Sequence, residues 1–387
     1  MDNSTMPEPT PKRVNDGGRT RSWNQTRAAA SLGIEYPIVQ GPMGGIATQR
    51  LAAAVSSGGG LGSFGAHGLS PAAIQEVIAE IRTLTAKPFA INLWVSMEDA
   101  GARTSGPAEF AHSLAPLAGH IQALGGTLPR YAPYQPVRFE EQARVVIEAN
   151  VPVFSFIYGI PPREILDECR RRNIVTVGSA TTPDEAIALE QAGVAVIVAS
   201  GSEAGGHRGS FLRRAEESLV GSFALLPQIV DAVSVPVVAA GGVADARGLL
   251  AAFALGAEGV QIGTAFLATE QSGASRLHRE AILSGKARQT ALTKGFTGRL
   301  ARGIQNQLLE ELSRPEVEVL PYPLQRVPVS SLARIAEPAG RAELLPLWAG
   351  QSASLARQND AAALLQALVS EVSAIAGPVL DWNRGRG

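Results

Sequence analysis

The residues best suited to chemistry lie in the glycine-rich segment GSEAGGHRG at 201–209, which follows an apolar run. Its histidine, His207, has glycine neighbours, so it lacks the apolar surroundings of a histidine that serves only packing. An imidazole with a pKa near its ordinary value of ~6.5 exchanges protons at physiological pH, and it can hold an anion when charged. We therefore expect His207 to be a catalytic acid–base group, and Arg208 to serve either the structure or a phosphate.

Two glycine turns follow two later apolar runs. Gly241-Gly242 follows one run, and Gly263-Thr264 follows the next. Glycine lets backbone N–H groups approach phosphate oxygens because no Cβ stands in the way, and the Thr264 hydroxyl can donate a further hydrogen bond. Two such turns in adjacent units favour a phosphate site, although simple tight turns after strands would use the same residues.

Polar side chains interrupt the apolar runs themselves. Asn92 ends one run, and Gln261 lies inside another. A side-chain amide at these places can hydrogen-bond a cofactor ring or a polyol chain, or it can pair with the neighbouring backbone. The turn QGPMGG at 40–45 closes the first run with backbone suited to lie against a flat ring.

Other motifs point to packing or to the solvent. The segment GLGSFG at 60–65 matches the dinucleotide fingerprint G-x-G-x-x-G. It follows a predicted helix and overlaps a predicted strand, whereas the fingerprint leaves a strand and opens a helix, so we interpret these glycines as relief for close packing. No metal site is expected, because the remaining histidines lack the spacing of metal ligands: His67, His112, His120 and His278.

The segments that must position these residues alternate between short apolar runs and helical patterns. One helix is predicted after Ser70 as N-cap, with Pro71 at its first position, and another after Thr182. Eight runs, each followed by a helix, favour an α/β fold of the (β/α)₈ TIM-barrel type, whose chemistry lies at the carboxyl ends of the strands. A doubly wound open sheet is the alternative. The runs are 38–40, 61–64, 89–92, 153–157, 174–177, 194–199, 235–240 and 259–262.

Composition limits the class of partner. The chain has 387 residues, a formal net charge of -1 and 18% charged residues, which is not the signature of a protein that binds nucleic acid or an anionic membrane. A small molecule is the better expectation. No apolar run approaches the ~20 residues that span a bilayer. Because Cys169 alone cannot form an internal disulfide, we expect an intracellular, cytoplasmic protein.

The repeating unit divides the chain into a barrel and additions to it. Residues 1–30 are expected to be a disordered N-terminal tail, and residues 31–285 the catalytic barrel. Residues 96–137 are long and rich in glycine and proline, so we expect a covering insertion over the active site. Residues 286–350 are expected to form a small accessory domain, with prolines that prevent regular elements in 315–332. Residues 351–387 are predicted to hold a C-terminal helix that packs back on the barrel.

The chain contains the turn QGPMGG, the strand FAINLWV, the loop EAGGHRG, the pair AAGGV and GVQIGT, and the late TGRLARG. Together these motifs resemble the nitronate monooxygenase family, formerly called 2-nitropropane dioxygenases, and its class I branch in particular. The resemblance runs from about residue 32 to residue 376. It implies an FMN-dependent barrel, an oxidoreductase that converts alkyl nitronates or nitroalkanes with O₂ to a carbonyl compound and nitrite.

The resemblance also implies roles for individual residues. His207 matches the family's catalytic histidine, which would remove the α-proton of a neutral nitroalkane. Ser200 departs from the family pattern, which often has glutamine there, so one flavin contact is expected to be lost or made through water. FMN contacts are implied at Met43, Asn92, Ser200, Gly205, Gly242, Gln261, Ile262, Gly263 and Thr264, with the phosphate at Gly242 and at 261–264.

Two other functions stay open from the sequence. Related barrels with similar phosphate loops act as NAD(P)H-dependent flavin reductases of quinones or enoyl thioesters. A barrel that binds a phosphorylated ligand as a sensor, without turnover, is the third possibility. The flavin monooxygenase is the function that the motifs favour.

Overall fold

A barrel of parallel strands forms the centre of the computed structural model, which describes residues 22–135 and 137–384. The eight strands form one sheet in the order β1-β9-β8-β6-β5-β4-β3-β2, and a parallel bridge between Val39 and Leu61 joins its two edges. The predicted barrel is therefore confirmed, and the doubly wound alternative is wrong. Every predicted run overlaps a strand: β1 (Ile38–Gln40), β2 (Gly62–Gly65), β3 (Phe89–Trp94), β4 (Val153–Ile157), β5 (Val175–Ala180), β6 (Val196–Ser200), β8 (Val237–Ala240) and β9 (Gly259–Ile262).

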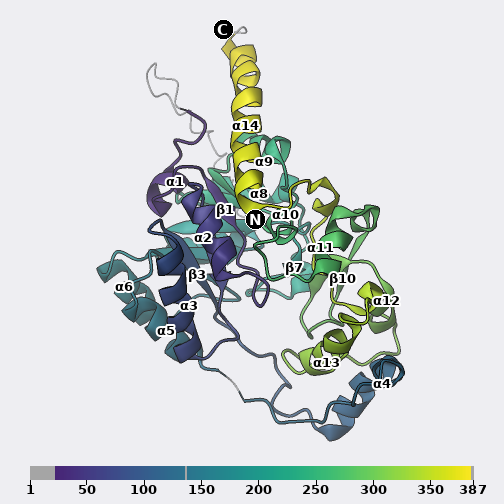
Figure 1. The fold of residues 1–387 in the computed structure, drawn as a ribbon. Helices are drawn as coiled ribbons and strands as arrows, with labels where there is room; N and C mark the ends of the chain where they lie inside the picture. Colours follow the sequence, from purple (N-terminus) through teal and green to yellow (C-terminus); the bar gives the residue numbers. More distant parts are fainter. Residues whose placement is uncertain (1–21, 136, 385–387) are drawn as a thin grey trace, which may run out of the picture.

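Helices surround these strands (Figure 1). The predicted caps are present, because Ser70 Oγ accepts the Ala73 N–H at 3.3 Å and Thr182 Oγ1 accepts the Glu185 N–H at 3.3 Å. Each cap satisfies one of the N–H groups that a helix start leaves without a partner. The helices are α2 (Gln49–Ser57), α3 (Pro71–Leu84), α5 (Phe139–Glu148), α6 (Arg163–Arg171), α7 (Pro183–Gln191), α8 (Ser222–Ala232), α9 (Ala246–Ala254), α10 (Thr264–Leu267) and α11 (Arg276–Leu283).

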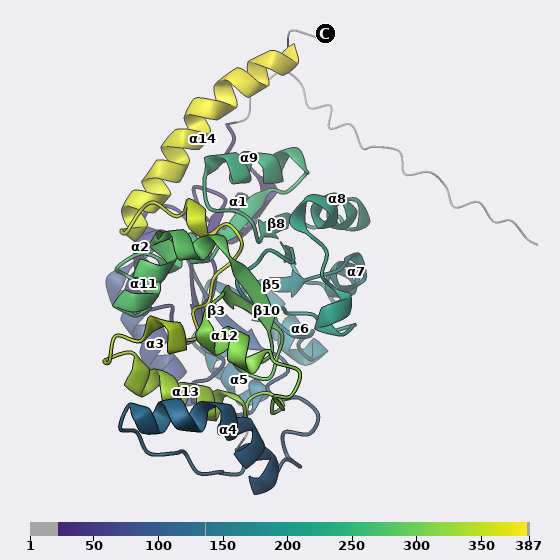
Figure 2. The same cartoon turned by 90° about the vertical axis from the view of Figure 1, so that its right-hand side faces the viewer.

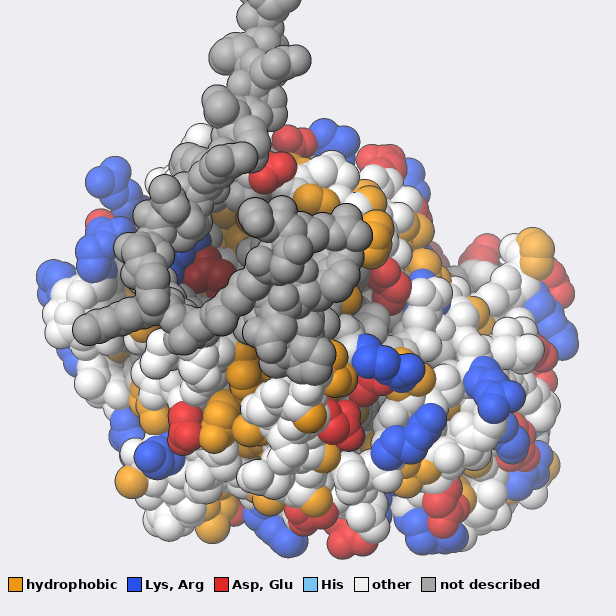
Figure 3. All heavy atoms as spheres, turned by 90° about the horizontal axis from the view of Figure 1, so that it is seen from above, with side chains coloured by type: hydrophobic (Ala, Val, Ile, Leu, Met, Phe, Trp, Pro, Cys, Tyr) orange, Lys and Arg blue, Asp and Glu red, His pale blue; other side chains and the backbone are white. Residues whose placement is uncertain are grey.

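The surface carries both signs of charge. On the face drawn in Figure 3, Lys and Arg side chains lie among Asp and Glu side chains, in keeping with the formal net charge of -1. In the two described ranges, no helix is long and apolar enough to cross a membrane.

Regular structure begins nearer the N-terminus than the sequence predicts. Residues 1–21 of the predicted tail lie outside the described residues, but residues 27–32 form helix α1 (Arg27–Leu32). Trp23 stacks on Tyr36 at 5.8 Å between ring centroids. The fully buried Ala28 and the nearly buried Leu32 pack against the amino-terminal end of the barrel interior. The prediction of a tail over 1–30 is thus wrong for its last residues, because they carry the apolar groups that close this end.

The predicted covering insertion, residues 96–137, contains a regular helix, α4 (Pro107–Ala123). Figures 1 and 2 show α4 beside α13 (Arg326–Ala336), at one end of the molecule, and the two helices pack together. The expectation that prolines exclude regular structure from 315–332 is wrong, because α13 begins inside that range. Pro328 is its third residue, where the backbone N–H would have no partner within the helix.

The accessory segment at 286–350 is joined to the barrel by a second sheet. Its strands are β10 (Thr290–Thr293) and β11 (Ala301–Ile304). β11 lies in the middle of this sheet and pairs antiparallel with β10 on one side and with β7 (Gly206–His207) on the other. β7 belongs to the loop after β6, so this sheet combines residues nearly a hundred positions apart. The remaining elements here are η2 (Gly285–Arg288), α12 (Gln307–Leu312) and η3 (Ala342–Leu344).

The C-terminal helix packs back on the barrel, as predicted. A 3₁₀ turn, η4 (Ala353–Leu355), precedes α14 (Ala361–Arg384), which contacts α2 and α9. Asp360 Oδ1 accepts the Ala363 N–H at 2.9 Å and so starts the helix. The buried positions among its described side chains are Ala361, Leu364, Leu365, Leu368, Val372 and Ala376.

The glycines at 60–65 serve packing, as interpreted. A Cβ on Gly62 would lie 1.8 Å from the carbonyl oxygen of Ala52 in α2. At Gly65 it would lie 2.7 Å from the Gly44 backbone. Only glycine lets the backbone of β2 lie this close to α2 and to the loop after β1.

We expect G62A to destabilise the protein by about 2 kcal/mol or more, because the added methyl group can only be accommodated by moving backbone. The matched control is G68A, where a Cβ would meet no atom within 4 Å. Urea unfolding of both variants checks this. Equal midpoints for G62A and G68A would contradict the packing role.

Candidate active site

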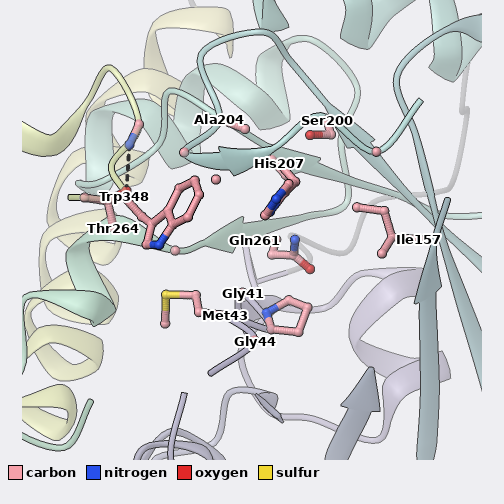
Figure 4. A pocket seen from close by; sticks show the side chains of 18 of the residues that line it. Gly41, Met43, Gly44, Ile157, Ser200, Ala204, His207, Gln261, Thr264 and Trp348 are labelled. Atoms are coloured by element: carbon pink, nitrogen blue, oxygen red, sulfur yellow. Dashed lines mark hydrogen bonds between the residues drawn. The ribbon is translucent and has the colours of Figure 1, made fainter. Parts of the chain in front are cut away.

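A pocket opens at the carboxyl ends of the barrel strands. In Figure 4, His207, Gln261 and Met43 surround a shared space from three different parts of the chain. Ile262 is the predicted contact that does not line the pocket, because its side chain is completely buried. The predicted residues in the wall are Met43, Asn92, Ser200, Gly205, His207, Gly242, Gln261, Gly263 and Thr264.

His207 is held by the second sheet and by aromatic neighbours. The pairing of β7 with β11 places His207 opposite Ala301. Its Nε2 atom lies 2.8 Å from Thr297 Oγ1. Trp94 meets the imidazole edge-on, with 4.9 Å between ring centroids, and Trp348 lies at 5.2 Å. These contacts fix the orientation of the ring.

The environment of His207 favours the neutral imidazole. The side chain lines the pocket, yet it lies deep in the protein, and this burial lowers the pKa of His207 well below the ordinary 6.5. The nearby imidazole of His67 and the positive charges of Arg299 and Arg326 lower that pKa further. The expectation of a pKa near 6.5 and of a charged, anion-holding imidazole is therefore wrong. At neutral pH, His207 is an uncharged acceptor or donor.

Arg208 is structural. Its guanidinium is almost completely buried and donates to the carbonyl oxygens of Ser200 at 3.0 Å and Ser218 at 3.0 Å, and also to that of Gly201 at 2.6 Å. These bonds tie the His207 loop to the end of β6. Arg208 is not part of the pocket wall, so the alternative of a phosphate contact is wrong.

A buried carboxylate anchors the other end of the same loop. Glu185 is fully buried at the start of α7, where its side chain accepts the N–H groups of Phe211 at 2.6 Å and Leu212 at 3.1 Å. It also accepts the N–H and the hydroxyl of Thr181, at 2.6 Å and 2.7 Å. Hydrogen bonds from several donors satisfy this charge away from water.

The two glycine turns leave backbone donors open beside the pocket. Among the described residues, the N–H groups of Gly242, Val243, Gly263 and Thr264 have no acceptor. Gly242 has φ of +78°, a conformation that suits glycine, and a Cβ on Gly263 would meet no protein atom. Thr264 Oγ1 accepts the Gly350 N–H at 2.9 Å, so its hydroxyl hydrogen is free to donate elsewhere. This set of donors suits an anion.

A side chain of the protein already occupies the N-terminus of the neighbouring helix α8. The carboxylate of Glu203, in the pocket wall, accepts the Ser222 N–H at 2.8 Å and the Ser222 hydroxyl at 3.0 Å. It therefore occupies the N-terminus of α8, where negative charge is stabilised. The open donors after β8 and β9 are the ones that remain for a ligand.

The two predicted amides differ in their partners. Asn92 Nδ2 donates to Ser155 Oγ at 3.0 Å inside the barrel, so this amide pairs with a neighbouring side chain. Gln261 has no hydrogen-bond partner among the described residues, and Figure 4 shows its amide in the pocket between His207 and the Met43 turn. Gln261 thus offers both a donor and an acceptor to a ligand.

Sequence reasoning missed an aromatic wall that comes from three segments. Trp94 ends β3, Tyr322 lies in the proline-rich stretch, and Trp348 precedes η4; all line the pocket. Trp94 and Tyr322 pack with 5.2 Å between ring centroids. Trp94 was visible in the motif FAINLWV, whereas nothing local marks Tyr322 or Trp348, because only the folded chain brings them to the barrel mouth.

Arg299 supports this wall from behind. Its guanidinium lies 4.2 Å from the ring centroid of Tyr158 and 4.5 Å from that of Tyr322. Asp99 Oδ1 accepts from its Nε at 2.8 Å, and the Ser96 carbonyl accepts from Nη1 at 2.9 Å. The described residues of 96–137 do not line the pocket. The insertion therefore does not form the pocket wall, and its first residues instead fix the cation that holds the aromatic rings.

Comparison with known proteins identifies the family of this chain. The model of a family described as nitronate monooxygenase matches residues 25–371, nearly the whole chain. The chain belongs to the nitronate monooxygenase family. This agrees with the resemblance seen in its motifs, and it makes the protein an oxidoreductase.

Relatives of this nitronate monooxygenase family member cover nearly its whole length. A probable nitronate monooxygenase from Staphylococcus aureus strain Newman is 42% identical over 354 residues, which is 91% of this chain and 99% of that protein. The solved structure of nitroalkane oxidase from Streptomyces ansochromogenes has a TM-score of 0.82 and 36% identity, over 91% of this chain and 99% of that one. FabK from Thermotoga maritima has a TM-score of 0.72 and 29% identity, over 92% and 99%.

His278 makes the stability of this family member depend on pH. It donates from Nε2 to the Trp348 carbonyl at 2.8 Å, and burial lowers its pKa to about 4. Because this value lies below the unfolded value of ~6.5, the folded protein binds fewer protons, and the unfolding free energy falls as the pH drops from ~6.5.

We expect wild type and H278Q to converge in stability by about 1 kcal/mol between about pH 6 and about pH 5, because the glutamine does not titrate. Urea unfolding of both proteins at each pH measures this difference. Parallel stability profiles would show that His278 is not held neutral by the fold.

Proposed function

We propose that this protein is an FMN-dependent enzyme that oxidises alkyl nitronates, and neutral nitroalkanes after loss of the α-proton, with O₂ to a carbonyl compound and nitrite. Two nitronate ions and one O₂ give two carbonyl compounds and two nitrite ions, so atoms, electrons and charge balance. The observation that carries the proposal is a neutral, fixed His207 on one side of a pocket whose other side has open backbone N–H donors at Gly242 and Gly263.

The pocket residues fit FMN. The open N–H groups at Gly242, Val243, Gly263 and Thr264 suit its phosphate. The bare backbone at Gly205 suits a flat ring, together with the Met43 turn and the unpartnered amide of Gln261, and Asn92 and Ser200 complete this part of the wall. When bound, FMN would supply the electron acceptor for the electron-rich nitronate carbon.

The chain's own residues would bind and orient the substrate and handle its proton. With Nε2 of His207 donating to Thr297 Oγ1, Nδ1 carries the lone pair that accepts the α-proton of a neutral nitroalkane. The buried imidazolium so formed would be stabilised by the nitronate anion beside it, since an unpaired buried charge is costly. Arg326, in the pocket wall, also favours an anionic substrate.

The walls of the pocket would exclude water from this reaction. Trp94 and Tyr322 are almost completely buried, and Trp348 covers the imidazole of His207 from another side. Low local polarity strengthens the interaction between a neutral base and the group it deprotonates, since competing water is absent. A substrate already in the nitronate form needs no base, so His207 would then serve mainly to position it.

The purified protein is expected to carry FMN, or to take it up, and to show the flavin absorption bands. Anaerobic mixing with an alkyl nitronate should bleach these bands rapidly, whereas NADH should not. A colourless protein that cannot take up FMN would contradict the proposal. Rapid bleaching by NADH but not by nitronate would instead support the flavin reductase of quinones or enoyl thioesters.

We expect H207Q to lower kcat/KM for neutral 2-nitropropane by about 10²–10⁴-fold, and to lower that for its nitronate much less, because only the neutral substrate needs a base. Oxygen consumption with each substrate measures both values. H112Q is the control, since His112 is 70% exposed and does not line the pocket. Equal losses on the two substrates would exclude a general-base role.

A further inference from the structure

We propose that His67 is a second substrate-binding histidine, whose imidazole donates a hydrogen bond from Nε2 to an oxygen of the nitro or nitronate group. This inference rests on the proposed function. His67 follows β2 and lines the same pocket as His207. Neither the motifs nor the spacing of the histidines marks it as part of the site.

The hydrogen-bonding groups of His67 are unsatisfied. The side chain is only 7% exposed, and its Nδ1 atom is buried without a partner. Nε2 also has no hydrogen-bond partner among the described residues, but unlike Nδ1 it is not completely buried. Leaving a buried polar group unpaired is unfavourable, so such groups in a folded protein call for a partner. A ligand in the pocket can reach Nε2.

The ring of His67 cannot turn to find another partner. It stacks on Trp94 with 3.9 Å between centroids and 10° between planes. The edge with Cε1 and Nδ1 lies against Gly44, where a Cβ would be 2.2 Å from Cε1 and 2.7 Å from Nδ1. Gly44 is thus the residue that gives the imidazole room. The indole and the Gly44 backbone fix the ring plane before any substrate arrives.

The surrounding charges define the protonation state of His67. Burial, together with the nearby guanidinium groups of Arg326 and Arg299, lowers its pKa to about 3. The ring is therefore neutral at working pH and has one N–H. An unpaired buried acceptor is tolerated better than an unpaired buried donor, so the proton belongs on Nε2, the nitrogen that can reach the pocket.

The position of His67 complements that of His207. Both imidazoles contact the same indole, His67 against the face of Trp94 and His207 at 4.9 Å in an edge-on arrangement. A nitroalkane offers an acidic C–H at carbon and acceptor oxygens on nitrogen, so it can meet a base and a donor at the same time. The donor at His67 would also stabilise the negative charge that moves onto these oxygens when the proton leaves.

The experiment compares wild type with H67F and H67Q as FMN-loaded proteins. Phenylalanine keeps a ring on Trp94 and removes the donor, whereas glutamine keeps an N–H donor. Anaerobic flavin reduction at increasing concentrations of propyl-2-nitronate gives the dissociation constant and the limiting rate. H112F, an exposed histidine, is the matched control.

We expect H67F to raise the nitronate dissociation constant about 10- to 100-fold, as for the loss of a hydrogen bond to a charged group, with the limiting rate, the FMN affinity and the melting temperature little changed. H67Q should recover part of the loss, and H112F should match wild type. If H67F does not fold, the comparison of H67Q with wild type still tests the proposal. Because glutamine keeps an N–H donor, H67Q should raise the nitronate dissociation constant less than about 10-fold.

Two results overturn the proposal. An unchanged dissociation constant in H67F shows that His67 does not bind the nitronate. Weaker FMN affinity at an unchanged nitronate dissociation constant places the contact on the flavin. A wild-type flavin that nitronate does not reduce contradicts the proposed function itself, and with it this inference, so the two failures can be told apart.

Discussion

The pairing of β7 with β11 is the contact on which the site depends. A two-residue strand after β6 cannot hold its shape alone, and here it is the edge of a sheet whose other strands come from 290–304. This pairing sets the position of His207, brings Thr297 within hydrogen-bond distance of it, and joins the accessory segment to the barrel mouth. Glu185 and Arg208 then fix the two ends of the loop from the barrel side.

The charged side chains near this contact have fixed partners, whereas the two imidazoles of the pocket are neutral. Arg299 is paired with Asp99 and lies against aromatic rings, while Glu203 is bound to the start of α8. His67 and His207 line the pocket, where burial and nearby cations keep them uncharged. The fixed positive charges beside this neutral base would stabilise the anion that forms once the proton has moved.

The sequence predicts the barrel and much of the pocket, because both depend on local patterns. Apolar runs bounded by glycine predict strands, and glycines after strands predict bare backbone at the barrel mouth. The aromatic wall could not be predicted, since Tyr322 and Trp348 reach the pocket only through packing of the accessory segment. The lowered pKa of His207 likewise depends first on burial in the folded protein, and then on Arg299 and Arg326, which are distant in the chain. His67 could not be predicted, because metal-ligand spacing says nothing about a histidine that acts alone.

The segment at 348–352 completes the pocket from outside the barrel. Every barrel strand ends by Ile262, but Trp348 completes the aromatic wall, Gly350 bonds to Thr264, and Gln351 donates to the Glu203 carbonyl. The pocket therefore depends on a segment that contributes no strand to the barrel. Ligand affinity thus reports on the docking of this segment as well as on the barrel itself.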